Sequence, residues 1–182
     1  MMSTSRLQPI ENPTSPMLRA LYFFSKIKTG KVISPLKVIY SRLPLAFGIW
    51  TNKMLSLEKK LPISAELRLL IRIYIAQLNT CHFCIDIAQA EAMKKFQHQE
   101  KFLSVQDFER SDLFTSDEKA ALRFAREVND KKVTDTSFHE IKKYFSEQEV
   151  ISVAWMVMSE NVYNIMNHAF AVESDGFCQI KK

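Results

Sequence analysis

Apolar positions recur with the spacing of helices along most of the chain, and no run alternates in the way that strands do. After a loose polar arm at residues 1–15, the spacing predicts a helix over residues 17–28, which Gly30 ends. Prolines then divide residues 35–60 into one or two short helices, with residues 44–50 packed inside. The pattern as a whole predicts an all-α protein.

The most apolar stretch predicts a buried central helix over residues 65–78, because its apolar residues occupy nearly every face. Ser64 is placed to cap the first turn of that helix. Asn79 and Thr80 end it, and Thr80 is expected to cap a second helix over residues 81–96. The junction between the two helices therefore lies beside the most buried part of the chain.

Three hydroxyl residues each precede a glutamate by three positions, which is the pattern of a capping box. The pairs are Thr115 with Glu118, Ser137 with Glu140, and Ser146 with Glu149. They predict helices over residues 116–130, 137–145 and 147–172, of which the last is long and largely apolar.

Composition indicates one helical domain with a sizeable core, since 47% of the 182 residues are hydrophobic and only 3 are glycine. The net charge of +5 is spread along the chain, so no basic stripe points to nucleic acid. No apolar run approaches the roughly 20 residues of a membrane span, and the first fifteen residues lack the apolar centre of a secretory signal. We therefore expect no membrane span and a cytoplasmic location.

The candidate chemistry is the pair Cys81 and Cys84, because two cysteines at this spacing meet on one helical turn. They could close a reversible disulfide, share a metal, or merely pack. A structural zinc site usually needs a second pair of ligands, and Cys178 has no close partner. Since cytoplasmic thiols are kept reduced, a redox role is favoured over a metal site or a packing role.

The histidines outside this pair stand alone in the sequence. His98 and His139 are expected at the surface, whereas His168, inside the apolar last helix, is expected in the core.

A thiolate is the attacking species in thiol chemistry, so features that favour ionisation matter. The first helical turn would place Cys81 near the positive end of the helix dipole, and His82 is a neighbouring imidazole. These features favour Cys81 as the more readily ionised thiol and Cys84 as its partner, without deciding which one attacks.

Residues 67–86, which end in Gln-Leu-Asn-Thr-Cys-His-Phe-Cys-Ile-Asp, resemble the core signature of the carboxymuconolactone decarboxylase-like superfamily. The branch they look like is the alkylhydroperoxidase D-like, or peroxidase-related, one. Its signature is an apolar helix, then Gln-Leu-Asn-Gly-Cys-x-x-Cys. Residues 113–122 and 161–167 are similar to the C-terminal half of that branch.

The resemblance implies an alkylhydroperoxidase D-like helical bundle over residues 35–175. An N-terminal arm and helix at 1–34 and a tail at 176–182 would lie outside this shared domain. Members of the branch are homo-oligomers, so the resemblance also implies a trimer or hexamer.

For function, the resemblance implies a thiol-dependent antioxidant oxidoreductase that works through a reversible Cys81–Cys84 disulfide. One thiolate would attack a hydroperoxide or a disulfide substrate, and the other cysteine would resolve the product. A protein or small-molecule thiol reductant would then restore the dithiol. No cofactor and no metal are expected.

Two positions depart from the branch. The glutamate that its members carry twelve residues before the first cysteine is Leu69 here, and the histidine four residues after the second is Ala88. Glu66, one turn before Leu69, and His82 are the candidate replacements. Both are weaker candidates than the cysteines, because each has an ordinary explanation as a surface residue.

In the branch that the chain resembles, that glutamate and histidine are the relay residues, which pass a proton to or from the reactive thiol. Without them we expect weak peroxidase activity, and an alternative stays open. In this alternative the protein is a non-catalytic thiol redox switch or oligomeric scaffold on the same fold. The lactone decarboxylation that names the superfamily does not rely on a Cys-x-x-Cys pair, so the pair argues against it.

Overall fold

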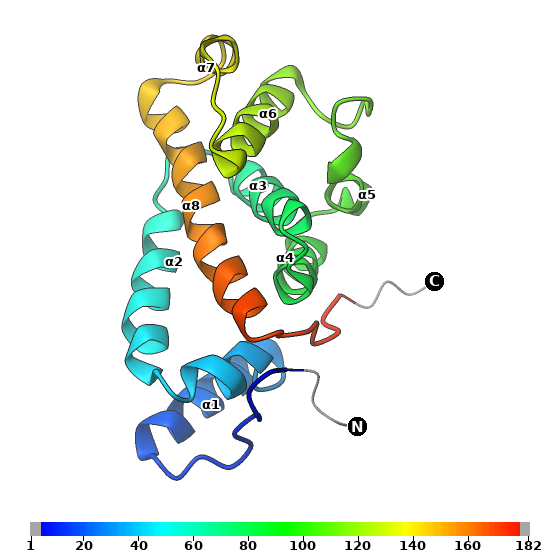
Figure 1. The fold of residues 1–182 in the computed structure, drawn as a ribbon. Coiled ribbons are helices and arrows are strands. Elements are labelled where there is room, and N and C mark those ends of the chain that lie inside the picture. The colour runs from blue at the N-terminus through cyan, green and yellow to red at the C-terminus, as the bar shows by residue number, and fades with distance from the viewer. Residues whose placement is uncertain (1–4, 179–182) are drawn as a thin grey trace.

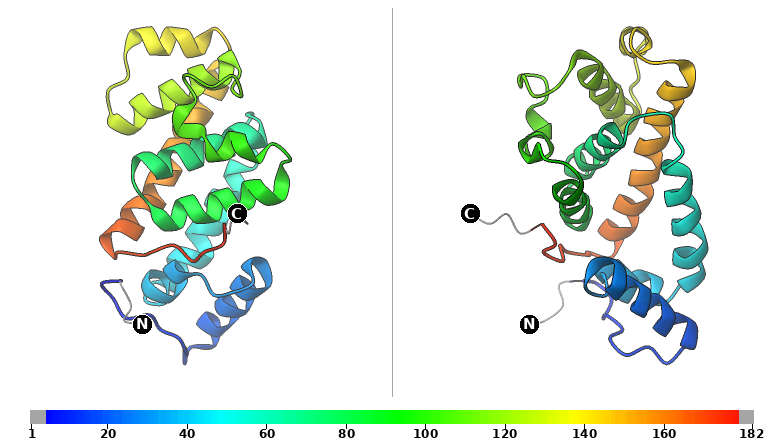
Figure 2. Two further views of the ribbon diagram at one scale, coloured as in Figure 1. Left: turned by 90° about the vertical axis from the view of Figure 1, so that its right-hand side faces the viewer. Right: turned by 180° about the vertical axis from the view of Figure 1, so that it is seen from behind.

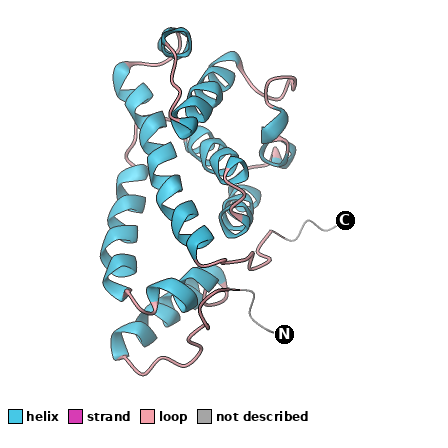
Figure 3. Ribbon diagram, in the orientation of Figure 1, coloured by secondary structure: helices cyan, strands magenta, loops and turns pink. Residues whose placement is uncertain are grey.

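The computed structural model describes residues 5–178, and every regular element within them is helical (Figures 1 and 3). The prediction of an all-α protein is confirmed. The elements, in chain order, are α1 Pro16–Thr29, the π-helical turns η1 Leu36–Tyr40 and η2 Ala46–Thr51, α2 Asn52–Glu58, α3 Ala65–Leu78, α4 His82–Lys95, α5 Gln99–Leu103, the 3-10 turn η3 Val105–Asp107, α6 Ser116–Asp130, α7 Asp135–Lys142 and α8 Glu147–Ala169.

The helix α8 is the longest element and runs through the middle of the molecule (Figures 1 and 2). It lies between α2 on one side and the pair α3 and α4 on the other. Helices α6 and α7 cover one end of this arrangement, and α1 covers the other (Figure 1). Residues from opposite ends of the chain therefore meet along α8.

The central helix α3 is buried because apolar residues cover nearly all of its faces. Its bounds and its cap are as the sequence predicts, since Ser64 Oγ accepts a hydrogen bond from Leu67 N at 3.0 Å. Leu69 and Ala88 both lie in the main hydrophobic core. The two positions that carry the relay residues in the peroxidase-related branch are thus ordinary core positions here.

Two of the three capping boxes are confirmed, those that begin α6 and α8. The third prediction is wrong, because α7 starts at Asp135 and its capping box pairs Thr134 with Ser137. The carboxylate of Glu127, on the preceding helix, accepts hydrogen bonds from both Thr134 and Ser137 and fixes this earlier start. Helix α8 also ends at Ala169, three residues before the predicted end.

The junction between α3 and α4 differs from its prediction as well. Thr80 adopts a left-handed conformation, with φ of 50°, and Cys81 rather than Thr80 occupies the N-cap position of α4. Thr80 N donates to Gln77 O at 3.0 Å and Cys81 N donates to Ala76 O at 2.9 Å, which is a Schellman ending for α3. The chain therefore turns sharply from one helix into the next.

Two predictions for the N-terminal region are wrong. Ile49 and Trp50, expected inside the protein, are 60% and 50% exposed. Residues 5–15 are not a loose arm, because Arg6 N donates to Phe170 O and Ile10 N donates to Lys37 O. Residues 1–4 of the predicted arm lie outside the described residues.

The end of the described chain is held against the start of α4. The buried carboxylate of Asp86 accepts hydrogen bonds from Phe177 N at 2.9 Å and Cys178 N at 2.6 Å. Asp175 in turn accepts from the backbone and hydroxyl of Ser34. The segment after α8 thus ties the residues that follow α1 to α4, and the division of the chain at residues 34 and 175 stays a prediction.

Candidate functional site

The structure brings Cys81 and Cys84 together as a disulfide, with their Cα atoms 5.3 Å apart. Both residues are nearly inaccessible to solvent, at 3% and 4% exposure. They form a small apolar cluster with Ala76, and the ring of Tyr163 packs against that cluster. The pair is therefore buried beneath α8 and not displayed on the surface.

The surroundings of the sulfur atoms favour a thiolate when the disulfide is reduced. Cys81 is the N-cap of α4 and Cys84 lies in its first turn, where free amide groups and the helix dipole stabilise negative charge. Asn167 Nδ2 on α8 donates toward Cys84 Sγ at 3.3 Å and toward Cys81 Sγ at 3.7 Å. The side-chain amide therefore adds a hydrogen-bond donor that the cysteine motif does not contain.

A stripe of buried polar residues runs along the side of α8 that packs against α3 and α4. Glu160, Asn164 and Asn167 are spaced four and three residues apart, so they share one face of the helix. Asn164 Nδ2 donates to Glu160 Oε1 at 2.6 Å, and Asn79 Nδ2 donates to Asn164 Oδ1 at 2.9 Å. The stripe thus connects the carboxylate of Glu160 to the junction that carries Cys81.

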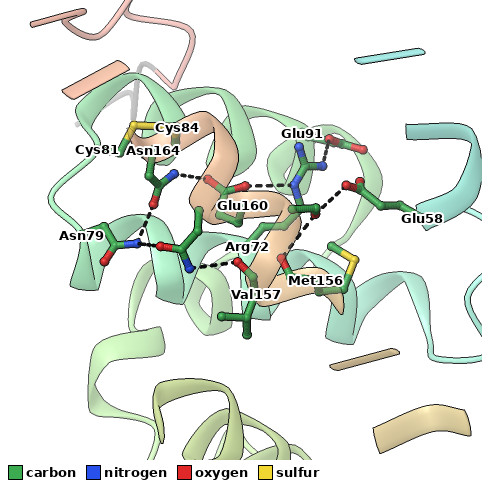
Figure 4. Close-up of polar contacts among 12 residues, drawn as sticks. Glu58, Arg72, Asn79, Cys81, Cys84, Glu91, Met156, Val157, Glu160 and Asn164 are labelled. Carbon is green, nitrogen blue, oxygen red and sulfur yellow. Dashed lines mark hydrogen bonds and ion pairs between the residues drawn. A yellow bond between two sulfur atoms is a disulfide. The ribbon is translucent and has the colours of Figure 1, made fainter. Parts of the chain in front are cut away.

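Arg72 on α3 holds several carboxylates near this stripe (Figure 4). Its Nε lies 3.6 Å from Glu160 Oε2, and its Nη1 lies 3.5 Å from Glu91 Oε2. Burial raises the pKa of Glu160 above its ordinary value, although the Arg72 guanidinium opposes this shift. Glu160 is therefore a buried carboxyl group whose protonated form is favoured by burial and opposed by Arg72.

Glu58 on α2 completes the cluster from the far side. Its Oε1 accepts a hydrogen bond from Ser159 Oγ at 2.7 Å, and both side chains are buried. Its charge favours the protonated form of Glu160 and the cationic form of Arg72. The cluster thus combines four elements, α2, α3, α4 and α8, around one guanidinium.

A pocket of about 430 Å³ opens beside the sulfur pair. Its walls come from α1, the η1 and η2 turns, α2, α3, α4 and α8, and they are mainly apolar. Cys84, Asn167, Arg72 and Glu160 are among the lining residues, whereas Cys81 is not. The pocket therefore gives a small molecule access to Cys84 in particular.

Tyr163 also lines the pocket, one turn before Asn167 on α8. Its hydroxyl oxygen is buried and has no hydrogen-bond partner among the described residues. Burial, with the nearby charge of Glu58, raises the pKa of Tyr163, so its hydroxyl stays protonated at neutral pH. It is thus a hydrogen-bond donor that no side chain or backbone group of residues 5–178 uses.

The two other predicted site residues lie elsewhere. His82 is exposed on the outer side of α4, although it stands between the cysteines in sequence. Glu66 is held by Lys101 Nζ at 2.8 Å, and that ammonium also contacts Glu118 at 2.7 Å. Neither His82 nor Glu66 lines the pocket, and their predicted roles stay hypotheses.

The expectation for His168 is wrong, whereas those for His98 and His139 are confirmed by their exposure. His168 is exposed because adjacent residues on a helix point in different directions, and Asn167 is the one that faces the sulfur pair. His168 Nε2 contacts the carbonyl oxygen of Asn79 and Thr80 Oγ1. It therefore contacts the junction between α3 and α4 from the solvent side.

Within residues 5–178, no cluster of three or more histidine, cysteine, aspartate or glutamate side chains is arranged to hold a metal ion. Over the same residues, no helix combines the length and apolar character that crossing a membrane requires.

Replacing Asn167 by alanine tests the amide at the sulfur atoms. Loss of a donor to the thiolate is expected to raise the pH of half-maximal thiol alkylation by about one unit, since a hydrogen bond to a charged group contributes roughly 1.5 kcal/mol. Iodoacetamide labelling of the reduced protein between pH 5 and 10 measures this. Asn129→Ala is the control, because it removes an amide that contacts Asn79 and Asn161 and has no sulfur contact. Its alkylation profile should match that of the wild type. An unchanged Asn167→Ala profile would contradict the assigned role.

No model of a known protein family matches the chain. The chain is similar to the uncharacterized protein YnjA of Escherichia coli K12, with 27% identity over 167 residues that cover 90% of this chain and 91% of YnjA.

Solved structures show the same fold. The debrominase Bmp8 has a TM-score of 0.79 at 19% identity, covering 97% of this chain and 95% of Bmp8. A peroxidase-related protein with an alkylhydroperoxidase AhpD core, from Ralstonia eutropha JMP134, has a TM-score of 0.74 at 17% identity, covering 97% and 96%. The fold is therefore that of the AhpD-like, peroxidase-related proteins, as the sequence predicts.

Proposed function

We propose that this protein is a thiol-dependent oxidoreductase whose redox centre is the Cys81–Cys84 pair. The observation that carries the proposal is the placement of a disulfide at the start of a helix, beside a pocket that reaches Cys84. The AhpD-like fold and the helix-terminal position of the sulfur atoms support it.

In the proposed cycle, the Cys84 thiolate attacks the outer oxygen of a hydroperoxide. The O–O bond breaks, its electron pair stays on the inner oxygen, and protonation gives an alcohol and a Cys84 sulfenic acid. The Cys81 thiol then displaces water from that sulfenic acid and forms the disulfide. Two electrons and two protons from an external dithiol or two thiols restore the reduced pair.

Cys84 is assigned as the attacking thiol because it lines the pocket and receives the shorter contact from Asn167. The sequence alone favours Cys81 as the more easily ionised thiol and leaves the attacker open. The pocket is the reason for choosing Cys84 over Cys81, since a substrate bound there would contact Cys84.

Proton transfer is assigned to Glu160 in place of the residues predicted from sequence. Glu160 lines the same pocket as Cys84, which places its carboxyl group where it can pass a proton to the departing oxygen, and burial raises its pKa in the direction that favours this role. The roles predicted for Glu66 and His82 are not needed in this proposal, because their side chains lie away from the pocket wall.

Stopped-flow oxidation of the reduced protein tests the proposed function. We expect the two thiols to be lost faster than those of free cysteine, both with a hydroperoxide and with a small disulfide, and we expect an intramolecular disulfide as the product. A rate no higher than that of free cysteine with every substrate would overturn the enzymatic proposal and favour the thiol switch or scaffold.

A second candidate is reductive dehalogenation of a small aromatic ring. The observation that favours it is the likeness, at a TM-score of 0.80, to a cysteine-to-alanine variant of Bmp8 in complex with 2,3,4-tribromopyrrole, together with the apolar pocket at Cys84. The dithiol would become a disulfide while an aryl bromide becomes the arene and hydrogen bromide. Bromide release from a bromopyrrole by the reduced protein tests this candidate.

A homo-oligomer is also proposed, because α1 exposes large apolar side chains that include Phe23 and Ile27, at 61% and 67% exposure. Light scattering during size-exclusion chromatography is expected to give a multiple of 21.1 kDa, three or six by the family resemblance. Placing Glu at both Phe23 and Ile27 should lower that mass, whereas Val133→Glu, on an exposed loop, should not. A monomeric wild type would contradict this proposal.

A further inference from the structure

We infer that the pocket at Cys84 binds a neutral, ring-sized apolar molecule that accepts a hydrogen bond from Tyr163. The inference about binding stands on the pocket itself, and the reaction of the bound molecule rests on the proposed function. It adds a substrate class and a specificity-determining residue to the redox centre.

The size of the pocket argues for a molecule much larger than hydrogen peroxide. A single water needs only about 10–15 Å³ of comparable volume, whereas this pocket offers about 430 Å³. Pockets of roughly 300–1,000 Å³ are those in which proteins bury most of a small organic ligand. Hydrogen peroxide would fill only a small part of this pocket.

The walls argue for an apolar ligand with a ring. Aromatic and branched aliphatic side chains from several elements line the pocket. Those that define the wall include Phe24, Ile33, Tyr40, Phe47, Phe83 and Ile87. Flat apolar walls of this kind favour an aromatic or alicyclic group over a polar chain.

The charges of the wall argue for a neutral ligand. Arg72 and Glu160 lie in the wall, but they face each other at 3.6 Å, and Arg72 also contacts Glu91. Lys28 also belongs to the wall and lies in the exposed last turn of α1. A charged ligand would have to disrupt the Arg72 pair in order to find a partner in the interior.

Two hydroxyl groups supply the specific polar contacts. Tyr163 Oη and Thr51 Oγ1 both belong to pocket-lining residues, are buried, and lack a hydrogen-bond partner among the described residues. A buried hydroxyl without a partner is costly, so a ligand oxygen that accepts from Tyr163 would bind favourably. Because Tyr163 lies one turn from Asn167, which contacts Cys84 Sγ, a ligand anchored at Tyr163 lies next to the sulfur.

Under the proposed function such a ligand is an aralkyl hydroperoxide, in which the O–OH group is on a saturated carbon beside the ring. Its ring fills the apolar pocket, and its inner oxygen accepts a hydrogen bond from Tyr163 while the Cys84 thiolate takes the outer oxygen. The O–O bond breaks, the inner oxygen receives a proton from Glu160, and the products are the aralkyl alcohol and a Cys84 sulfenic acid.

Binding is tested first, with the non-reactive alcohol 2-phenylpropan-2-ol as the probe and the oxidised protein as the receptor. Saturable binding in titration calorimetry or NMR is expected. Tyr163→Phe should weaken it about fivefold to tenfold, and Thr51→Val should weaken it less. Tyr144→Phe, which alters an exposed tyrosine that does not line the pocket, should leave binding unchanged. Thermal melting of each variant identifies any loss of affinity that comes from misfolding.

Kinetics form the second arm. The quantity measured is the rate of thiol oxidation by cumene hydroperoxide divided by the rate with hydrogen peroxide. For the reduced protein this ratio should be at least tenfold higher than for free cysteine. Tyr163→Phe should bring the ratio closer to that of free cysteine. Fast oxidation by both peroxides without any preference, and without probe binding, would overturn the inference and leave the proposed function intact. Saturable, Tyr163-dependent binding without thiol oxidation would support the inference about binding and overturn the proposed function.

Discussion

Replacing Cys84 by serine is expected to lower thiol-dependent turnover by at least about a thousandfold, because the attacking sulfur is lost and a serine hydroxyl is not ionised at neutral pH. The fold should persist, since the substitution changes one atom in a site that already contains polar groups. Steady-state hydroperoxide or disulfide reduction measures the loss. Cys178→Ser is the matched control.

Cys81→Ser should behave differently from Cys84→Ser. Without the resolving thiol, the protein is expected to consume one equivalent of hydroperoxide and stop with a sulfenic acid on Cys84, which dimedone labelling and mass spectrometry detect. The reverse pattern, with a trapped sulfenic acid on Cys81, would show that the attacker has been assigned wrongly.

The choice of Cys178 as the control follows from its surroundings. Burial, and the negative charge of Asp86, raise the pKa of its thiol, so it is a poor nucleophile at neutral pH. It also lies outside the pocket wall. Full activity of Cys178→Ser is therefore expected, and a large loss would mean that the redox cycle includes a third thiol.

Replacing Arg72 by methionine is expected to destabilise the protein by about 3–5 kcal/mol, because it leaves buried carboxylates without their cation. Glu160 and Glu91 both contact Arg72, and Glu58 is close enough to influence it. Urea unfolding followed by circular dichroism measures the change. Arg123→Met, which breaks a largely exposed pair with Glu109, should cost less than about 1 kcal/mol.

The same variant makes a prediction about pH. Because the pKa of Glu160 is raised in the folded protein, the native state binds its proton more tightly than the unfolded chain does. The contribution of Glu160 to the free energy of unfolding is therefore greatest at low pH. It falls as the pH rises from the ordinary pKa of a glutamate, which applies in the unfolded chain, through the raised pKa of the folded protein. Arg72→Met should make that fall steeper. Adding Glu160→Gln should flatten it and recover part of the lost stability. An Arg72→Met protein with wild-type pH dependence would contradict this account.

The helices could be predicted where local signals determine them. Ser64 and Ser146 cap their helices through contacts with residues three positions later, so sequence spacing is enough to find them. The start of α7 could not be predicted in the same way, because Glu127 from α6 selects Thr134 over Ser137. Thr80 likewise looks like a cap in sequence, yet the tight turn between two packed helices forces it into a left-handed conformation.

The candidate site was only partly predictable. The Cys81 and Cys84 spacing reveals the sulfur pair, and polar residues repeated on one face of an apolar helix could have revealed Glu160, Asn164 and Asn167. Their partners could not be found from spacing. The pairing of Arg72 with Glu160 exists only because α3 and α8 pack side by side.

The central position of α8 has a consequence for how the site arises during folding. Its contacts join residues far apart in sequence, since Asn167 comes 83 positions after Cys84 and Ser159 comes 101 positions after Glu58. The cysteine pair leaves the ribosome long before the helix that covers it. Until α8 docks, that pair is an accessible dithiol without its amide donor, its buried carboxyl group or its pocket. The selective chemistry proposed for this centre would therefore be a property of the completed fold, and no fragment that lacks α8 should possess it.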